Sequence, residues 1–314
     1  MSKARVYRSS SREFECKLID TGEMIMATAL GNLLKRDNNI VVGDIVLLDE
    51  EGVITEVEKR SSEIFRFLPR TQKKKITAAN CDLLIILNSV SKPDFKRGFS
   101  DRFLLRASQW GIKPVMIFNK MDQFTDQFDF KFEVDRLKDL GVECFEISAK
   151  FPETEKRFIE NGTAELQEFV KGRTAIFLGQ SGVGKSKTIS LLAGMDIELK
   201  TQEVGKAGKG SHTTTWSEII DCGDFSLIDS PGIRSFSLED LIEDDLLELF
   251  PDLEERAVNC KFSDCKHTQK TKGCAFFKPH LDPDSYEGRL VHSRLESYSR
   301  VHEEITENPA WSKK

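Results

Sequence analysis

No uninterrupted hydrophobic run in this 314-residue sequence approaches the roughly 18 residues that a membrane-spanning helix needs. The basic start of the chain, from Met1 to Arg12, is not followed by a hydrophobic stretch, which argues against a secretory signal. Internal repeats and low-complexity tracts are also lacking. The sequence therefore indicates neither a membrane protein nor a repeat protein. We expect a cytoplasmic, globular protein whose N-terminus is a basic arm.

Cysteine is sparse, with seven residues, an odd number, of which four stand alone in the sequence. Such usage does not provide a disulfide framework and fits a reducing compartment. The other three cysteines and a histidine lie within fifteen residues, and thiolates with a neutral imidazole suit a structural Zn²⁺ site that leaves no position for catalytic water. Gly273 and several lysines make this segment too polar to favour the alternative of buried core cysteines. The candidate ligands are Cys260, Cys265, His267 and Cys274.

Charge is unevenly distributed, and the net charge is −6. A negative average argues against a general nucleic-acid binder. Residues 238–256 hold nine acidic side chains and one basic side chain, whereas residues 261–278 hold five lysines and one aspartate. Charged runs are commonly solvated surfaces, so the lysine-rich stretch favours contact with RNA only alongside other evidence.

A chain of this length, with 39% hydrophobic and 31% charged residues, is expected to form two or three compact units. Over residues 1–70, short and partly alternating apolar runs are separated by turn signals such as Thr21-Gly22, which predicts a small β-barrel. From Ala79 onwards, continuous apolar runs and a helical stretch predict a doubly wound α/β domain over residues 71–238. The third predicted domain, residues 239–314, is polar, mostly helical and carries the cysteine cluster.

A glycine-rich loop lies between the apolar run Ala175–Leu178 and a helical stretch that begins near Ile189. It matches the phosphate-loop pattern Gly-x4-Gly-Lys-Ser in the strand–loop–helix context that this pattern requires. Glycines let backbone N–H groups surround phosphate oxygens, Lys185 can reach the β- and γ-phosphates, and Ser186 can bind Mg²⁺. The assigned nucleotide-binding loop comprises Gly179, Gln180, Ser181, Gly182, Val183, Gly184, Lys185, Ser186 and Lys187.

Two further motifs indicate which base the nucleotide carries. The first directly follows the apolar run Val115–Phe118, and its Asp122 carboxylate can accept hydrogen bonds from N1 and N2 of guanine, a pair that adenine cannot supply. The Lys120 stem would cover the ring, so this motif favours GTP over ATP. The second motif follows the run that ends at Ile147 and would supply a backbone N–H to guanine O6. The first motif comprises Asn119, Lys120 and Asp122, and the second comprises Ser148, Ala149 and Lys150.

The residues expected near the γ-phosphate begin where the apolar run Phe225–Ile228 ends. Asp229 can hold Mg²⁺ through water, and the Gly232 N–H can meet the γ-phosphate. In Ras-like enzymes the residue after this glycine is a glutamine that orients the attacking water. Here the residue after Gly232 is Ile233, so slow intrinsic turnover is expected.

Another segment must then supply the polar group for hydrolysis. Residues 210–215 lie between the phosphate loop and Asp229, where the first switch loop is expected. In this segment Thr214 would close on Mg²⁺ and the γ-phosphate. His212 is the candidate water-orienting residue, although a lone histidine in a loop is more often a bystander.

The order of the motifs is unusual. The base-reading motifs at 119–122 and 148–150 precede the phosphate loop at 179–187, whereas an ordinary GTPase carries the phosphate loop first. The chain therefore looks circularly permuted. In this order the segment that senses the γ-phosphate leads directly into the C-terminal domain, so nucleotide state could move that domain.

Together these motifs resemble the RsgA (YjeQ/YloQ) family of circularly permuted GTPases, which act in late maturation of the small ribosomal subunit. The resemblance spans nearly the whole chain and also includes Val42-Gly43-Asp44, Ala78-Ala79-Asn80-Cys81-Asp82 and Asp101-Arg102-Phe103-Leu104. It implies an oligonucleotide/oligosaccharide-binding (OB) barrel, a GTPase domain and a zinc domain, with hydrolysis stimulated by the small subunit. It also implies His212 as the catalytic group.

Three residues depart from the usual family pattern. Lys187 stands where a second Ser or Thr is usual, and Ser230 replaces a commoner Thr; neither change is expected to alter the chemistry. Ser211 replaces a usual Arg, which puts a basic contact of the switch loop in doubt rather than hydrolysis.

The favoured function is thus a GTPase that acts as a monomer on the small ribosomal subunit and its rRNA, with GTP or GDP, Mg²⁺ and one structural Zn²⁺. The alternative is an RNA-binding assembly factor for which GTP only reports a state. Stimulation of kcat by small subunits separates the two. A P-loop kinase that acts on a small molecule is disfavoured by Asn119 and Asp122, and selectivity for GTP over ATP would test it.

Overall fold

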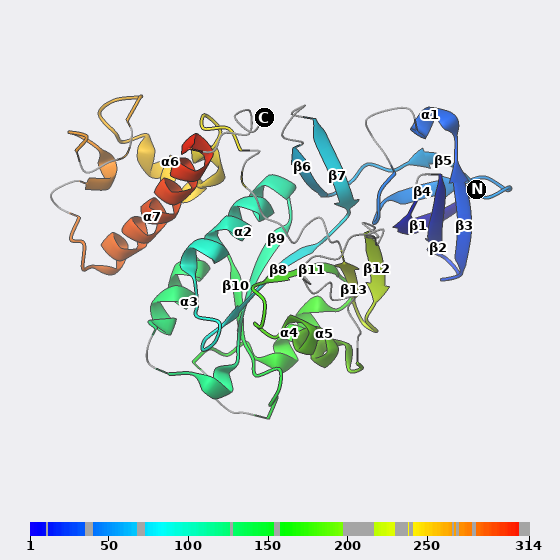
Figure 1. Ribbon diagram of the computed structural model, residues 1–314, viewed down its shortest axis with the longest axis horizontal. Helices are drawn as coiled ribbons and strands as arrows, with labels where there is room; N and C mark the ends of the chain where they lie inside the picture. Colours follow the sequence, from blue (N-terminus) through cyan, green and yellow to red (C-terminus); the bar gives the residue numbers. More distant parts are fainter. Residues whose placement is uncertain are drawn as a thin grey trace, which may run out of the picture.

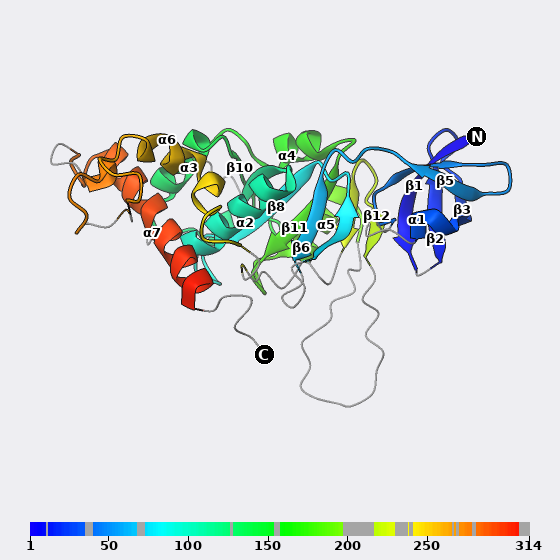
Figure 2. The same cartoon turned by 90° about the horizontal axis from the view of Figure 1, so that it is seen from above.

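The computed structural model describes residues 1–10, 12–34, 40–67, 73–125, 128–153, 158–196, 217–229, 238, 241–265, 267, 270–277 and 281–307. The described residues form three parts: a small N-terminal barrel, a central sheet flanked by helices, and a C-terminal group of helices (Figure 1). Figure 2 shows these parts in a row, with the barrel and the C-terminal helices at opposite ends. The multidomain organisation is thereby confirmed, whereas the expected domain boundaries stay predictions.

The N-terminal part is a closed five-stranded barrel, as the alternating apolar runs predict. Its neighbouring strands pair in the order β1-β2-β3-β5-β4, and β4 pairs with β1 to close the ring. Alternate side chains of these strands, such as Ala4 and Val6 or Val46 and Leu48, fill the barrel core. The elements are β1 (Ser2–Ser9), β2 (Glu13–Leu18), β3 (Met24–Ala29), α1 (Gly31–Leu34), β4 (Ile45–Leu48) and β5 (Val53–Val57).

The prediction of a basic arm at the N-terminus is wrong. Residues Ser2–Ser9 form β1, which pairs with β2 and β4, and Ala4 and Val6 are fully buried between them. Lys3 and Arg5 alternate with the buried residues and therefore point out of the barrel core. The pairing of β1 with β2 shifts register between Val6 and Arg8, so Arg8 leaves this alternation and contacts carboxylates on the neighbouring strands.

The central part is a doubly wound sheet, in agreement with the sequence. Five parallel strands are ordered β10-β9-β8-β11-β13, and β12 lies antiparallel beside β13. β12 also pairs with β1, so the barrel continues the central sheet at this edge. The strands are β8 (Leu83–Ser89), β9 (Lys113–Asn119), β10 (Glu143–Glu146), β11 (Thr174–Gly179), β12 (Glu218–Asp221) and β13 (Ser226–Asp229).

Helices cover both faces of this sheet (Figure 1). Alternate residues of the central strand β8 enter two different cores: Leu84 and Ile86 pack with residues of α2 and α3, whereas Leu83 and Ile85 pack with residues of α4 and α5. Burial on both sides explains why the strand sequences are continuously apolar. The helices are α2 (Arg97–Trp110), η1 (Met121–Gln123), α3 (Phe130–Asp139), α4 (Thr163–Val170) and α5 (Lys185–Ala193).

A separate two-stranded sheet, β6 (Glu63–Phe67) and β7 (Lys74–Ala79), connects the barrel to the central part. The expected boundary between residues 70 and 71 falls between these two paired strands. β6 also contacts the central part, because the Trp110 indole of α2 donates to the Phe65 carbonyl at 3.0 Å.

The C-terminal part consists of η3 (Leu247–Leu249), α6 (Pro251–Ala257), η4 (Ala275–Phe277) and α7 (Tyr286–Glu307). Phe250, Phe276 and Leu295 belong to its core, which also includes Leu105 of α2. The C-terminal helices therefore pack on the central part through apolar side chains. None of the helices described here is long and apolar enough to cross a membrane.

Candidate nucleotide site and metal centre

Four sequence motifs meet at the carboxyl edge of the parallel sheet. Asn119, Gly179 and Asp229 are the last residues of β9, β11 and β13, and Ser148 lies two residues after β10. The strand of the phosphate loop, β11, lies between β8 and β13 although it comes late in the chain. In open α/β sheets ligands bind at this edge, where the strand order reverses. The fold thus gathers the motifs in the place that a nucleotide site requires, whatever their order along the chain.

The Asn119 side chain joins three of these motifs. Its Nδ2 donates to the Val183 carbonyl of the phosphate loop at 2.8 Å, and its Oδ1 accepts from the backbone N–H of Ala149 at 3.0 Å. The same Oδ1 accepts from the Lys120 N–H at 2.8 Å. Asn119 is almost completely buried, at 2% exposure, so these bonds are shielded from water. Asn119 therefore fixes the base-reading motifs relative to the phosphate loop.

Lys120 and Ser148 make further links between the motifs. Lys120 adopts a left-handed backbone conformation with φ of 67°, and its ammonium donates to the Gly182 carbonyl at 2.8 Å and to the Lys92 carbonyl. The Ser148 hydroxyl accepts from the Asp122 N–H at 3.0 Å, which holds the backbone of the residue assigned to guanine. Lys92 had no signal in the sequence, because its contribution is a backbone carbonyl on a loop.

The glycines of the phosphate loop are required by its backbone and its neighbours. Gly182 and Gly184 have φ of 81° and 99°, which favour glycine. A Cβ added at Gly184 would overlap Asn119 Nδ2, and one added at Gly179 would lie 2.7 Å from the Leu87 carbonyl oxygen. The loop thus approaches the neighbouring strands closely and leaves no room for side chains at these positions.

Helix α5 begins at Lys185, directly after Gly184, so its first amide groups face the loop. Such a helix N-terminus is a favourable place for phosphate. Ser186 is half-buried in the first turn, Lys187 is exposed, and Asp229 is half-buried at the end of β13. Thr188 anchors the turn, because its hydroxyl donates to the Gly184 carbonyl at 3.1 Å.

The remaining assigned residues fall into two groups. Gln180 is half-buried in the phosphate loop and Ser181 is exposed there, while Lys150 is exposed and its ammonium lies 5.1 Å from the Phe151 ring centre. Thr214, His212, Gly232 and Ile233 lie outside the described residues. Their expected roles are therefore proposals.

Comparison with known proteins agrees with this geometry. The model of the RsgA GTPase family matches residues 57–239. The chain belongs to this family. Small ribosomal subunit biogenesis GTPase RsgA of Bacteroides fragilis is 34% identical over 289 residues, which cover 88% of this chain and 90% of the relative. The protein of the same name from Christiangramia forsetii is 31% identical over 321 residues and covers 96% of both chains.

Solved structures of RsgA-family proteins share the fold. YjeQ from Thermotoga maritima superposes with a TM-score of 0.70 at 25% identity, covering 97% of this chain and 98% of the other. YloQ, described as a circularly permuted GTPase, gives a TM-score of 0.68 at 23% identity, covering 98% and 96%. The permuted arrangement and the assignment of this chain as a GTP hydrolase are confirmed.

The C-terminal cysteine cluster forms a second candidate site. One ligand atom from each of Cys260, Cys265, His267 and Cys274 lies within 4.8 Å of all the others. His267 adopts a φ of 49°, and its Nδ1 lies 3.7 Å from Cys260 Sγ. Burial raises the pKa of Cys274 to about 12, so a thiolate there requires a nearby cation. Three thiols and one imidazole brought together in this way fit a tetrahedral metal site.

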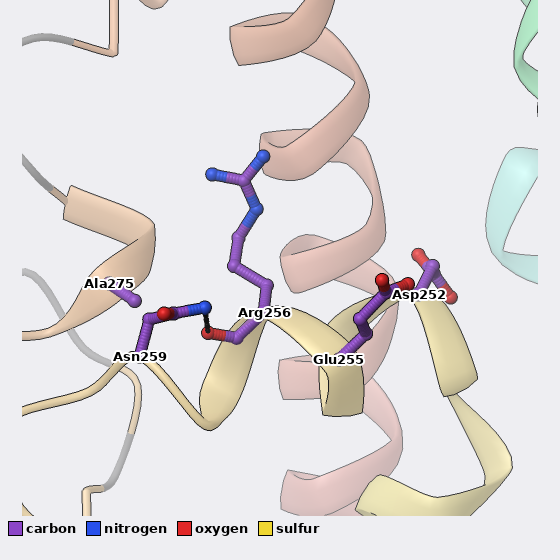
Figure 3. Close-up of a pocket in the computed structure, with 5 residues that line it drawn as sticks. All are labelled: Asp252, Glu255, Arg256, Asn259 and Ala275. Atoms are coloured by element: carbon purple, nitrogen blue, oxygen red, sulfur yellow. Dashed lines mark hydrogen bonds between the residues drawn. The ribbon is translucent and has the colours of Figure 1, made fainter.

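A cavity of about 360 Å³ lies beside this cluster, lined by Asp252, Glu255, Arg256, Asn259 and Ala275 (Figure 3). Two of its charged residues join α6 to α7. Asp252 binds Arg294 at 2.9 Å and Arg256 binds Glu287, both on α7. Figure 3 also shows the Asn259 amide donating to the Arg256 carbonyl, at 3.4 Å. No residue of the nucleotide motifs lines this cavity.

Proposed function

We propose that this chain hydrolyses GTP on the small ribosomal subunit during its maturation. The proposal rests on the buried hydrogen bonds by which the Asn119 side chain joins the guanine-reading motifs to the phosphate loop. Relatives that carry the name small ribosomal subunit biogenesis GTPase cover nearly the whole chain, which supports the subunit as the partner.

The direct test compares GTP turnover with and without purified small subunits. We expect slow turnover by the free protein, because Ile233 offers no polar group for the attacking water. Addition of small subunits should raise kcat many-fold, whereas large subunits should not. If kcat stays unchanged with small subunits while binding to them depends on GTP, the alternative of an RNA-binding assembly factor that only senses GTP would take the place of this proposal.

The proposed roles of the phosphate-site residues follow from their places in the fold. Lys185 would contact the β- and γ-phosphates, and the first amides of α5 would bind phosphate oxygens. Ser186 and Thr214 would supply oxygen ligands to Mg²⁺, with Asp229 acting through water, and the donor set suits this hard cation. Mg²⁺ would neutralise charge on the phosphates. His212 would orient the attacking water and Gly232 would donate to the γ-phosphate.

Asp122 is proposed to recognise guanine, and its replacement should change the base preference. The Ser148 hydroxyl holds the backbone N–H of Asp122, so the backbone at this residue is positioned by the protein itself. Asp122→Asn should lose two charge-assisted hydrogen bonds to guanine, each of about 1.5–3 kcal/mol, and weaken GTP binding by about 10²-fold or more. Binding of xanthosine triphosphate should improve, because xanthine offers the complementary pattern.

Fluorescence titration with labelled GTP and xanthosine triphosphate measures this change. Asp135→Asn is the matched control, since Asp135 is a carboxylate on the surface of α3 that pairs with Lys131. It should leave both affinities unchanged. Unaltered selectivity for GTP in Asp122→Asn would remove Asp122 from base recognition.

The cysteine cluster is proposed to hold one structural Zn²⁺. Binding energy in such sites is folding energy, so Cys265→Ser should release the metal and unfold the segment around residues 260–277. The nucleotide site, which shares no ligand with the cluster, should still bind GTP. Metal analysis of freshly reduced protein and hydrogen exchange of this segment are the measurements.

Cys222→Ser is the matched control for this experiment, because Cys222 lies in the core of the central sheet and should leave the zinc content at one per chain. Wild-type protein without zinc would contradict the metal site. So would a Cys265→Ser variant that retains the metal with unchanged affinity.

The remaining proposals concern partners. A closed five-stranded barrel fits the OB type, whose faces bind oligonucleotides, and we propose rRNA as its ligand. The lysines around the zinc cluster would contact phosphates of the same RNA. We also propose that the protein acts as a monomer.

A further inference from the structure

The junction between the barrel and the central sheet involves only a short stretch of backbone. β1 pairs with β12 at a single register position, Arg8 opposite Glu218. Side chains strengthen this junction, since Arg8 Nε lies 2.7 Å from Glu218 Oε2. The Glu218 side chain is 13% exposed, so most of this carboxylate is shielded from water.

Arg8 and Glu218 belong to a row of charged residues that crosses four strands. Glu218 lies opposite Asp229 of β13, and Arg8 lies opposite Glu15 of β2, with 3.1 Å between Arg8 Nη1 and Glu15 Oε2. Directly opposed residues of antiparallel strands have their side chains on the same face of the sheet. We call Asp229, Glu218, Arg8 and Glu15 the charged row. It runs from the carboxylate assigned to the Mg²⁺ site to the second strand of the barrel.

The other end of β12 is also held by the barrel. The Tyr7 hydroxyl donates to Asp221 Oδ1 at 2.8 Å, and the Lys17 ammonium lies 2.7 Å from Asp221 Oδ2. The first and last residues of β12 are therefore both bound by side chains of β1 and β2. A displacement of β12 must strain or break these contacts, or carry the barrel strands with it.

We infer that Arg8 is a positioning residue that couples the Mg²⁺·GTP site to the N-terminal barrel through Glu218. Like charges directly opposite each other on neighbouring strands repel, and opposite charges attract. Asp229 and Glu218 are such a like-charged pair by register, and Arg8 binds Glu218 from the strand on the other side. When Mg²⁺ binds with the nucleotide beside Asp229, its positive charge changes the electrostatic force of Asp229 on Glu218, and therefore the forces on β12 and on Arg8. This inference rests on the role proposed above for Asp229.

Hydrogen exchange of the free protein, measured by mass spectrometry, tests the coupling without any ribosome. Nucleotide-free protein is compared with protein saturated with Mg²⁺ and a non-hydrolysable GTP analogue. In the wild type, the exchange of β1 and β2 amides should differ between the two states. In Arg8→Ala this difference should disappear from β1 and β2, while the change around the phosphate loop remains. Arg8→Lys, which keeps the charge, should restore part of it.

Lys3→Ala is the matched control, because Lys3 lies on the same strand and makes an ion pair of 2.8 Å with Glu58 inside the barrel part. It should keep the nucleotide-dependent difference. The inference is overturned if wild-type β1 and β2 do not respond to Mg²⁺·GTP analogue, or if Arg8→Ala responds as the wild type does. Failure of small subunits to stimulate turnover would count against the proposed function instead, since the exchange experiment contains no ribosome.

Discussion

Replacement of Arg136 by methionine should lower the stability of the central part by about 3–5 kcal/mol, the usual effect of removing one partner from a buried ion pair. The Arg136 side chain is fully buried, and its guanidinium lies 2.9 Å from Asp101 and 3.0 Å from Glu133. Burial acts to lower the pKa of Arg136, but these two carboxylates outweigh it, and the net effect is a raised pKa. Without the guanidinium, both carboxylates stay buried with one partner fewer.

The measurement is the Tm of the purified variant, which should fall by about 6–20 °C, given about 2–4 °C per kcal/mol for units of this size. Lys131→Met is the matched control, because it removes a positive charge from the same helix at an exposed ion pair. Its Tm should stay close to that of the wild type. Equal Tm values for Arg136→Met and Lys131→Met would show that the buried network contributes no more than a surface pair.

The effect should extend to the C-terminal helices, because Asp101 also faces α7. Arg294 Nη1 lies 3.6 Å from Asp101, and the Ser297 hydroxyl donates to the same carboxylate. Arg294 in turn binds Asp252 of α6 at 2.9 Å. Hydrogen exchange of α7 should therefore rise in Arg136→Met and remain unchanged in Lys131→Met.

Replacement of His212 by alanine should lower the subunit-stimulated GTPase rate by about 10²-fold or more, as for other positioned catalytic groups. The reason is that Ile233 leaves hydrolysis without a side chain for the attacking water, so the switch segment must supply one. We expect the small subunit to act by fixing that segment. GTP affinity and subunit binding should remain nearly intact.

Single-turnover hydrolysis on an excess of small subunits measures this rate directly. Ser211→Ala changes the preceding residue and is the matched control, which should keep most of the stimulated rate. If His212→Ala hydrolyses GTP on the subunit as fast as the wild type, another group must hold the water, with rRNA as the next candidate.

Much of the nucleotide site could be predicted because its signals are local. Gly179 to Ser186 and Asn119 to Asp122 each follow a short apolar run, and strand, loop and helix are all visible within about fifteen residues. The hydrogen bonds of the Asn119 side chain could not be predicted, because the one to Val183 spans 64 residues and depends on the order of the strands in the sheet. The same holds for Asp101 and Ser297, which meet across 196 residues.

The N-terminal strand β1 was not predicted for a related reason, because its partners are distant in the sequence or visible only in the folded barrel. Ala4 and Val6 are small or short apolar residues among basic ones, and a strand of this kind is recognised only with its partners β2 and β4 in place. Once these partners are present, Arg8 faces Glu218 and Glu15, and a segment expected as a free arm becomes the link between two parts of the molecule.

The sequence by itself determined the class of chemistry, because the residue types that bind phosphate, guanine and a thiophilic metal are few and their spacing is short. It also determined the permuted order of the motifs. Only the tertiary structure decided which side chains join those motifs, which strand of the barrel continues the central sheet, and how the C-terminal helices attach to α2. These features depend on packing between residues that are far apart in the chain, and local patterns carry no information about such partners.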